Sequence, residues 1–306
     1  MAFTAQDVKK LREMTGCGMM DCKKALTQSE GDFDKAIEFL REKGLAAAEK
    51  KASRIAAEGM VYATADVAAK VGVVVEVNAE TDFVAKNETF QTFVKDVAEV
   101  VKTQAPADVD ALLACDMNGQ TVEAALKEKI LVIGENLKIR RFERFEGICA
   151  AYVHGGGTHG VLVQFKADDA AAATPAFTVF GKDIAMQIAA ANPAYVRKED
   201  VPASVIDKEK EILQAQIEND PKLATKPDAV KVKMVEGRIG KYYKENCLVD
   251  QEYVKDPDIN VAQYVANTAK ELGTAIEIIK FARFQKGEGL EKRVDDFAAE
   301  VASMTK

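Results

Sequence analysis

The sequence predicts an α+β protein with a duplicated core, and three observations lead to this prediction. The β-branched run 71–77 is typical of a buried strand, whereas 88–102 repeats its apolar residues at helical spacing. Two glycines, Gly59 and Gly72, recur 88 positions later in similar strand-like segments. A later segment, 137–145, recurs 139 positions further along. We therefore expect two similar layers, each a small, mainly antiparallel sheet with helices on one face.

Each copy reads as strand, strand, helix, helix, strand. Phe142 and Phe145 of the first copy match Phe281 and Phe284 of the second, and we expect these rings to pack the cores. The second spacing exceeds the first by 51 residues, which is the length of an insertion inside the second copy. The predicted strands are 59–67, 71–79 and 137–146 in the first copy, and 147–154, 160–167 and 275–285 in the second.

Residues 1–45 predict a small bundle of three helices. Thr4 and Asp7 can open the first helix as a capping box. Asp32 caps the third helix, and Gly44 lies just past its predicted end. Residues 46–58 are rich in alanine and charge, which indicates a helical linker.

The second predicted helix contains two adjacent methionines, which cannot both face a core because neighbouring residues lie about 100° apart on a helix. Met19 shares a face with Cys22 and Leu26, whereas Met20 falls among lysines. Met20 is therefore a candidate contact for a partner, since thioethers adapt to irregular surfaces. The alternative is an isolated exposed methionine without a function.

The insertion at 195–246 predicts a helical hairpin that forms a coiled-coil arm. A two-helix hairpin buries little by itself, so its seam is either self-paired in solvent or completed by a partner or a second copy. The apolar stripes are Ile206, Leu213 and Ile217 on one helix, and Val232, Val235, Ile239 and Tyr242 on the other.

The remaining chain divides around this arm. We assign one core subdomain to 59–146 and the other to 147–194 with 247–286. The final segment, 287–306, starts with a glycine turn and predicts a C-terminal helix module.

The stretch 81–87 connects a predicted strand to a predicted helix, which Asn87 can cap. Connections lie on protein surfaces, so Phe83 either tucks under the following helix or meets a partner. Single aromatic residues in surface connections usually fold back, and this reasoning favours a tucked ring.

Composition limits the function. The net charge of −7 disfavours direct binding of nucleic acid, which needs a basic surface. No apolar run approaches the roughly 18 residues of a membrane span, and the N-terminal residues do not resemble a signal peptide, so we expect a cytoplasmic protein. Five scattered cysteines fit a reducing compartment and structural roles.

No catalytic constellation is evident, and we expect no enzyme, no cofactor and no metal site. The two histidines, His154 and His159, flank a glycine run that predicts a hairpin loop, where either could contact a partner. Two histidines are too few ligands for zinc unless carboxylates join them. A hydrolase that uses one of them with Asp168 or Asp169 is a remote alternative, because no nucleophile is positioned.

Two long motifs resemble those of a known family. Residues 11–26 resemble the amino-terminal signature of bacterial elongation factor Ts, and 76–87 resemble its second signature. Residues 154–163 and 287–292 are also similar, so the resemblance covers essentially the whole chain. Cys17 departs from the family pattern, in which alanine is common at this position, and the glycine loop replaces a basic variant.

This resemblance implies a guanine-nucleotide exchange factor for elongation factor Tu, a GTPase. It also implies a ubiquitin-associated-like first domain that binds the partner. By the same analogy, Phe83 wedges near the Mg²⁺ site of the GTPase, and Thr81, Asp82 and Val84 act at this contact. The other contacts implied by the resemblance are Met19, Met20 and His154. A homodimer through the arm, or a 2:2 complex, is possible, and a non-catalytic adaptor is the alternative function.

Overall fold

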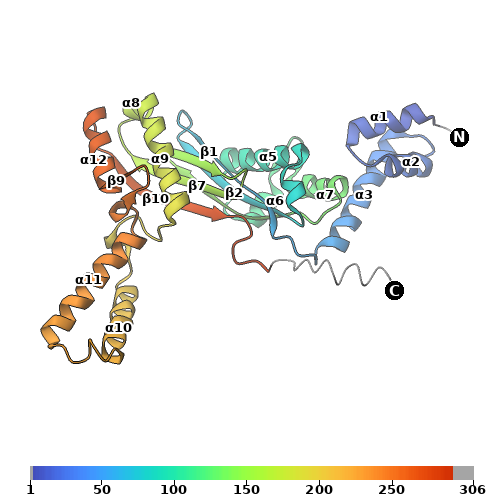
Figure 1. Ribbon diagram of the computed structural model, residues 1–306. Coiled ribbons are helices and arrows are strands. Elements are labelled where there is room, and N and C mark those ends of the chain that lie inside the picture. Colours follow the sequence, from blue (N-terminus) through green and yellow to red (C-terminus); the bar gives the residue numbers. More distant parts are fainter. Residues whose placement is uncertain (1–2, 292–306) are drawn as a thin grey trace.

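The computed structural model describes residues 3–291 and places a helical bundle and a two-helix arm at opposite ends of a double-sheet core (Figure 1). It is a mixed α+β structure with small antiparallel sheets, as the sequence predicts. The C-terminal helix predicted within 287–306 falls almost wholly on 292–306, which lie outside the described residues.

The N-terminal bundle consists of α1 (Ala5–Thr15), α2 (Met19–Gln28) and α3 (Phe33–Lys51). Thr4 and Asp7 form the predicted capping box of α1. The predicted end of the third helix at Gly44 is wrong, because α3 continues to Lys51. Gly44 is buried inside α3, where an added Cβ would lie 3.4 Å from the carbonyl oxygen of Lys127. The glycine therefore serves the close approach of α3 to a helix of the core.

The first copy of the repeat follows the predicted order of strands and helices. Its elements are β1 (Glu58–Asp66), β2 (Val71–Ala79), α4 (Asp82–Ala85), α5 (Glu88–Gln104), α6 (Val109–Ala114), β3 (Asp116–Met117), β4 (Gln120–Thr121), α7 (Val122–Ile133) and β5 (Lys138–Glu146).

The second copy repeats this order around the arm. Its elements are β6 (Ile148–His154), β7 (His159–Lys166), α8 (Asp169–Ala172), α9 (Pro175–Ala191), the 3₁₀ helices η1 (Lys198–Asp200) and η2 (Leu248–Asp250), β8 (Glu252–Tyr253), β9 (Asp256–Asn260), α12 (Val261–Leu272) and β10 (Glu277–Gln285).

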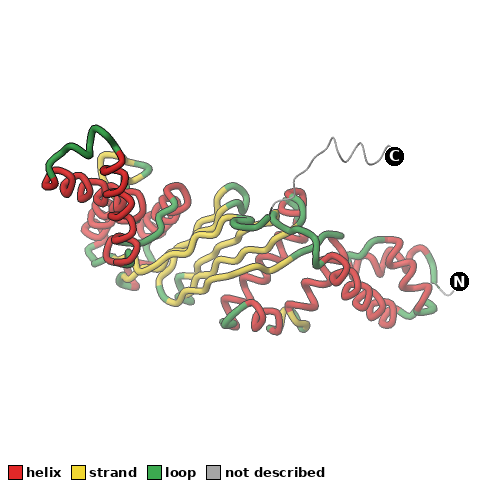
Figure 2. Tube along the Cα trace, turned by 90° about the horizontal axis from the view of Figure 1, so that it is seen from below, coloured by secondary structure: helices red, strands yellow, loops and turns green. Residues whose placement is uncertain are grey.

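The two sheets have the same topology and pack face to face. The strand orders are β1-β2-β5 and β10-β7-β6, with all neighbours antiparallel and the second strand of each copy in the centre. Figure 2 shows the strands of both sheets together in the middle of the molecule, with helices on both sides of them. A Cβ on Gly72 would overlap Leu162 of the other sheet, and one on Gly160 would overlap Val61. The close approach of the sheets thus explains one of the two glycine pairs of the repeat, Gly72 and Gly160.

The matched aromatic residues pack the cores, as predicted. Phe145 and Phe284 lie in the apolar cluster between the two sheets, together with Leu162. Phe142 packs against the cluster formed with the helices of the first copy, and Phe281 against that of the second.

The arm consists of α10 (Ala203–Asn219) and α11 (Asp228–Asn246). Its apolar seam contains Leu213 and Ile217 on α10, and Val235 and Ile239 on α11. Val232, which the sequence placed in the seam, is exposed instead. No helix among residues 3–291 is both long enough and apolar enough to cross a membrane.

Candidate partner-binding site

Phe83 lies on α4, the single helical turn that follows β2, and its ring is 77% exposed. No other large apolar side chain in the described part of the chain is as exposed. The expectation that the ring tucks under the next helix is therefore wrong. Lys86 lies near the ring, with its Nζ 6.0 Å from the ring centroid and 3.6 Å from Asp82 Oδ2.

Val84 accounts for the outward direction of the ring. Its side chain is 6% exposed and belongs to the core cluster under β2 and α5. Adjacent residues on a helical turn point about 100° apart, so burial of Val84 directs Phe83 outward. The resemblance implies that Val84 acts at the contact, and in the structure its buried side chain anchors the turn from below.

Glu135, which follows α7, holds the start of this turn. Its Oε2 accepts hydrogen bonds from the amides of Glu80 (3.1 Å) and Thr81 (3.0 Å), and its Oε1 accepts one from the Thr81 hydroxyl (2.6 Å). Thr81 is the N-cap of α4, yet its side chain makes no bond to the amides of that turn. The hydroxyl that would cap the helix is instead bound to Glu135.

The loop after α7 also donates a hydrogen bond back to the loop before α4. Glu80 Oε1 accepts a hydrogen bond from the amide of Asn136 (2.6 Å), and lies 3.3 Å from the guanidinium of Arg54. The Asn136 side chain donates to the carbonyl of Arg54 (2.8 Å), which joins the linker to the same cluster. We call Arg54, Glu80, Thr81, Glu135 and Asn136 the clamp. Sequence reasoning missed it, because no local pattern pairs loops that lie more than 50 residues apart.

Both methionines of α2 are exposed, Met20 at 73% and Met19 at 44%. The sequence placed Met19 on the same inward face of α2 as Cys22 and Leu26. On this face the buried residues begin at Cys22, one turn after Met19. Met19 is the first residue of α2 and lies before this contact begins, so its predicted inward position is wrong. Two neighbouring thioethers therefore lie on the surface of the bundle, on a separate module from Phe83.

The glycine run forms the predicted hairpin between β6 and β7, with His154 paired to His159. His154 is exposed, and its Nδ1 lies 3.0 Å from the hydroxyl of Tyr152. Burial lowers the pKa of His159, and the positive charge of Arg283 lowers it further. Asp168 caps α8 and Asp169 pairs with Lys70, so neither carboxylate forms a dyad with a histidine.

Phe83 and His154 lie towards the same end of the sheets. The first residue of β1, Glu58, pairs with Ala79 at the end of β2, just before the clamp. Close by, the amide of Val61 donates to the carbonyl of Gly157 in the histidine hairpin (2.8 Å). The structure thus gathers two of the sequence-predicted contacts at one edge of the core.

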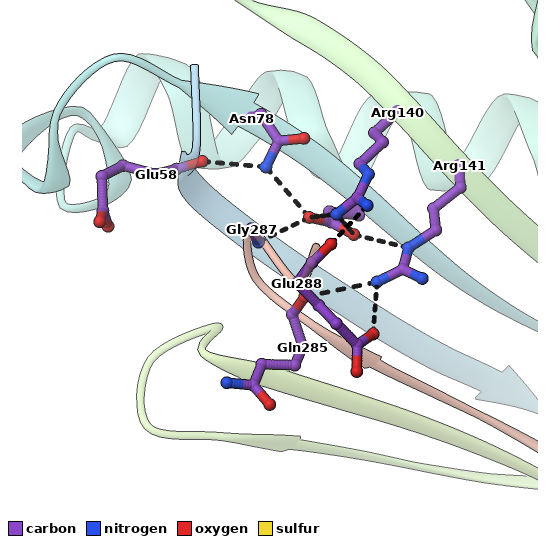
Figure 3. Close-up of polar contacts among 8 residues, drawn as sticks. Glu58, Asn78, Arg140, Arg141, Gln285, Gly287 and Glu288 are labelled. Atoms are coloured by element: carbon purple, nitrogen blue, oxygen red, sulfur yellow. Dashed lines mark hydrogen bonds and ion pairs between the residues drawn. The ribbon is translucent and has the colours of Figure 1, made fainter. Parts of the chain in front are cut away.

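The segment after β10 is bound to this same region by Glu76, a fully buried carboxylate on β2. Its partners Asn78, Arg140, Arg141 and Gly287 are labelled in Figure 3. Glu76 accepts hydrogen bonds from Arg141 Nε (2.7 Å), Arg140 (3.0 Å), Asn78 (3.0 Å) and the amide of Gly287 (2.8 Å). Burial alone would raise the pKa of Glu76, but the bonds from Gly287, Asn78 and Arg141 outweigh it, and the pKa is lowered. The carboxylate therefore stays ionised and joins the two subdomains.

No group of three or more His, Cys, Asp or Glu within residues 3–291 is arranged to hold a metal ion. Cys149 lies between the sheets, where burial raises the pKa of its thiol to about 11.

Comparison with known proteins finds sequences that are similar over nearly the whole chain. The family model described as "Elongation factor TS" matches residues 80–288. Proteins named elongation factor Ts are similar over almost their entire length. That of Clostridium perfringens is 50% identical, covering 99% of each chain, and that of Trichlorobacter lovleyi is 48% identical, covering 99% of this chain and 98% of its own. That of Syntrophotalea carbinolica is 48% identical, covering both chains completely. The chain belongs to the elongation factor Ts family, whose role is in translation elongation.

Proposed function

We propose that this protein binds the GTPase elongation factor Tu and accelerates its release of GDP. The observation that carries the proposal is the ring of Phe83, which is held 77% exposed on a turn bound to the core. Exposing a phenylalanine forgoes about 1.5–3 kcal/mol of burial energy. A partner that covers the ring recovers this energy.

GDP release follows when the ring enters the partner near its Mg²⁺ site. Mg²⁺ bridges phosphate oxygens to the GTPase, so displacing the metal weakens the hold on the nucleotide. Asp82 precedes Phe83 in the turn, so its carboxylate meets the partner beside the ring. The backbone of Thr81, at the start of the turn, lies at the same contact. The factor must bind nucleotide-free partner more tightly than GDP-bound partner, and GDP must weaken the complex by the same factor.

The other exposed residues hold the partner in place. Met19 and Met20 provide an adaptable apolar contact on the bundle. His154 provides a second, polar contact at the histidine hairpin. No bond is made or broken in the factor, so it is not an enzyme and needs no cofactor. We expect the partner to be bound in the cytoplasm, and the acidic net charge argues against direct contact with nucleic acid. The exposed apolar side chains of the arm are available for a homodimer or a 2:2 complex.

The test measures release of a fluorescent GDP from elongation factor Tu. We expect acceleration by the wild-type protein, its loss with Phe83→Ala, and its retention with Val179→Ala. Val179 is the matched control because it is also a strongly exposed apolar residue, 58% exposed on α9. Wild-type rates with Phe83→Ala would refute the role of the ring.

A plain adaptor is the second candidate, and the two exposed methionines favour it, because they could bind a partner without any wedge. An adaptor would bind elongation factor Tu without changing the GDP release rate. Binding that is lost with Met20→Ala, together with no acceleration by the wild type, would support the adaptor.

A further inference from the structure

We propose that Glu135 is a positioning residue that holds the Phe83 ring exposed for its partner. This inference deepens the proposed function and rests on it. Glu135 accepts three hydrogen bonds from two consecutive residues, Glu80 and Thr81, immediately before the turn that carries the ring.

The turn needs this support because it is too short to hold itself. Helix α4 has four residues, and a single helical turn is unfavourable without tertiary contacts. Its other attachments are the buried side chain of Val84 and a bond from Gln91 to the carbonyl of Ala85 (2.9 Å). These fix the middle and the end of the turn, whereas Glu135 fixes its beginning.

Glu135 is itself well placed for this purpose. It follows Gly134, the left-handed C-cap that ends α7, and precedes Asn136, which is buried. The amide of Asn136 bonds to Glu80, and its side chain bonds to the linker. The carboxylate therefore projects from a fixed corner of the core, and its bonds are charge-assisted, the stronger class of hydrogen bond.

The second copy of the repeat provides an internal comparison. At the spacing of 88, Val84 corresponds to Ala172 in α8, and both are buried. Phe83 corresponds to Ala171, so this copy carries no ring. At the spacing of 139, Glu135 corresponds to Thr274, so this copy also carries no clamp carboxylate.

The turn without a ring is capped by a local side chain, and its long-range polar contact is the exposed ion pair of Asp169 with Lys70. Asp168 caps α8 through the amides of Ala170 (2.9 Å) and Ala171 (3.4 Å). The fold thus forms this turn without a carboxylate from a distant loop. The long-range clamp accompanies the exposed ring, which is expected if it prevents the ring from folding back and keeps it ordered before binding.

The test uses two readouts. The first is the efficiency of GDP release from elongation factor Tu, where losing charge-assisted bonds in Glu135→Ala is expected to reduce acceleration about tenfold. Thr81→Val removes only the hydroxyl donor and is expected to give a smaller loss. Glu123→Gln is the matched control on α7, because Glu123 pairs with Lys127 on its own helix and not with the turn, so the rate should stay unchanged.

A double-mutant cycle separates positioning from general damage. If Glu135 acts through the ring, Glu135→Ala has no further effect in a Phe83→Ala background. If the two losses multiply instead, Glu135 acts elsewhere and the proposal is overturned.

The second readout does not depend on the partner. The chain contains no tryptophan, so Phe83→Trp introduces a single tryptophan at the turn, whose emission can be excited separately from that of the tyrosines. We expect its emission to shift to the blue when Glu135→Ala is added, because a ring that folds back onto the core leaves water. Unchanged fluorescence would overturn the proposal. A fluorescence change without any acceleration of GDP release by the wild type would refute the proposed function while upholding the clamp.

Discussion

Replacing Glu76 should cost more stability than replacing any exposed glutamate on the same sheet. Glu76→Gln keeps the shape of the side chain but removes the buried charge opposite Arg140 and Arg141. Removing one partner of a buried ion pair costs about 3–5 kcal/mol. The side chains of Arg140 and Arg141 are 21% and 30% exposed and can regain some water, so we expect the lower end, about 3 kcal/mol.

The assay is urea unfolding followed by circular dichroism, with Glu146→Gln as the control. Glu146 also pairs with an arginine, Arg144, at 2.6 Å, but its side chain is 77% exposed. An exposed pair contributes about 0–1 kcal/mol. Equal losses for the two variants would refute the reasoning that burial makes the Glu76 pair valuable.

The lowered pKa of Glu76 determines how the stability of the protein should change with pH. The pKa of Glu76 is lowered in the folded protein from an ordinary value of 4.5. Its ionised form therefore stabilises the fold fully above pH 4.5, and this contribution is lost as pH falls through the folded pKa. The stability gap between wild type and Glu76→Gln should shrink below pH 4.5 and stay constant from pH 6 to 8.

Three further outcomes are expected. Gly72→Ala should destabilise the protein by about 1–3 kcal/mol, measured by urea unfolding, because its Cβ would overlap Leu162 across the sheets. Gly287→Ala should cost at least about 1–2 kcal/mol in the same assay, because Gly287 has a left-handed backbone at φ 67° and its Cβ would overlap the carbonyl of Ala57. Cys149, with a pKa raised to about 11, should resist thiol reagents at pH 8 while the half-exposed Cys115 reacts, as mass spectrometry of the labelled protein would show.

Much of the fold could be predicted because its signals are periodic and local. The β-branched run of β2, the helical spacing in α5 and the caps at Thr4 and Asn87 each involve residues a few positions apart. The repeat added the matched strands, since a duplicated sequence folds in the same way twice. Gly44 misled the prediction because glycine both ends helices and permits close packing, and only the position of α7 distinguishes the two.

The candidate site was harder to predict, because the exposure of a side chain depends on distant residues. Nothing near Phe83 in the sequence shows that Val84 occupies the space beneath the turn, or that Glu135 binds Thr81 from 54 positions away. Met19 was misplaced for a similar reason, since helical periodicity does not tell where the contact with the next helix begins.

The two copies differ in sequence at the place where the segment after β10 contacts the first copy. Glu76 of the first copy corresponds to Gln164 of the second, which donates to the carbonyl of Glu146 in place of accepting from arginines. Arg140 and Arg141 correspond to Ile279 and Lys280, both exposed on β10. The buried carboxylate and its two arginines thus exist only in the copy that receives the end of β10. A symmetric pair of sheets could pack equally well without them, so these charges fix where the chain leaves the core: beside the linker and at the edge that presents Phe83 and His154.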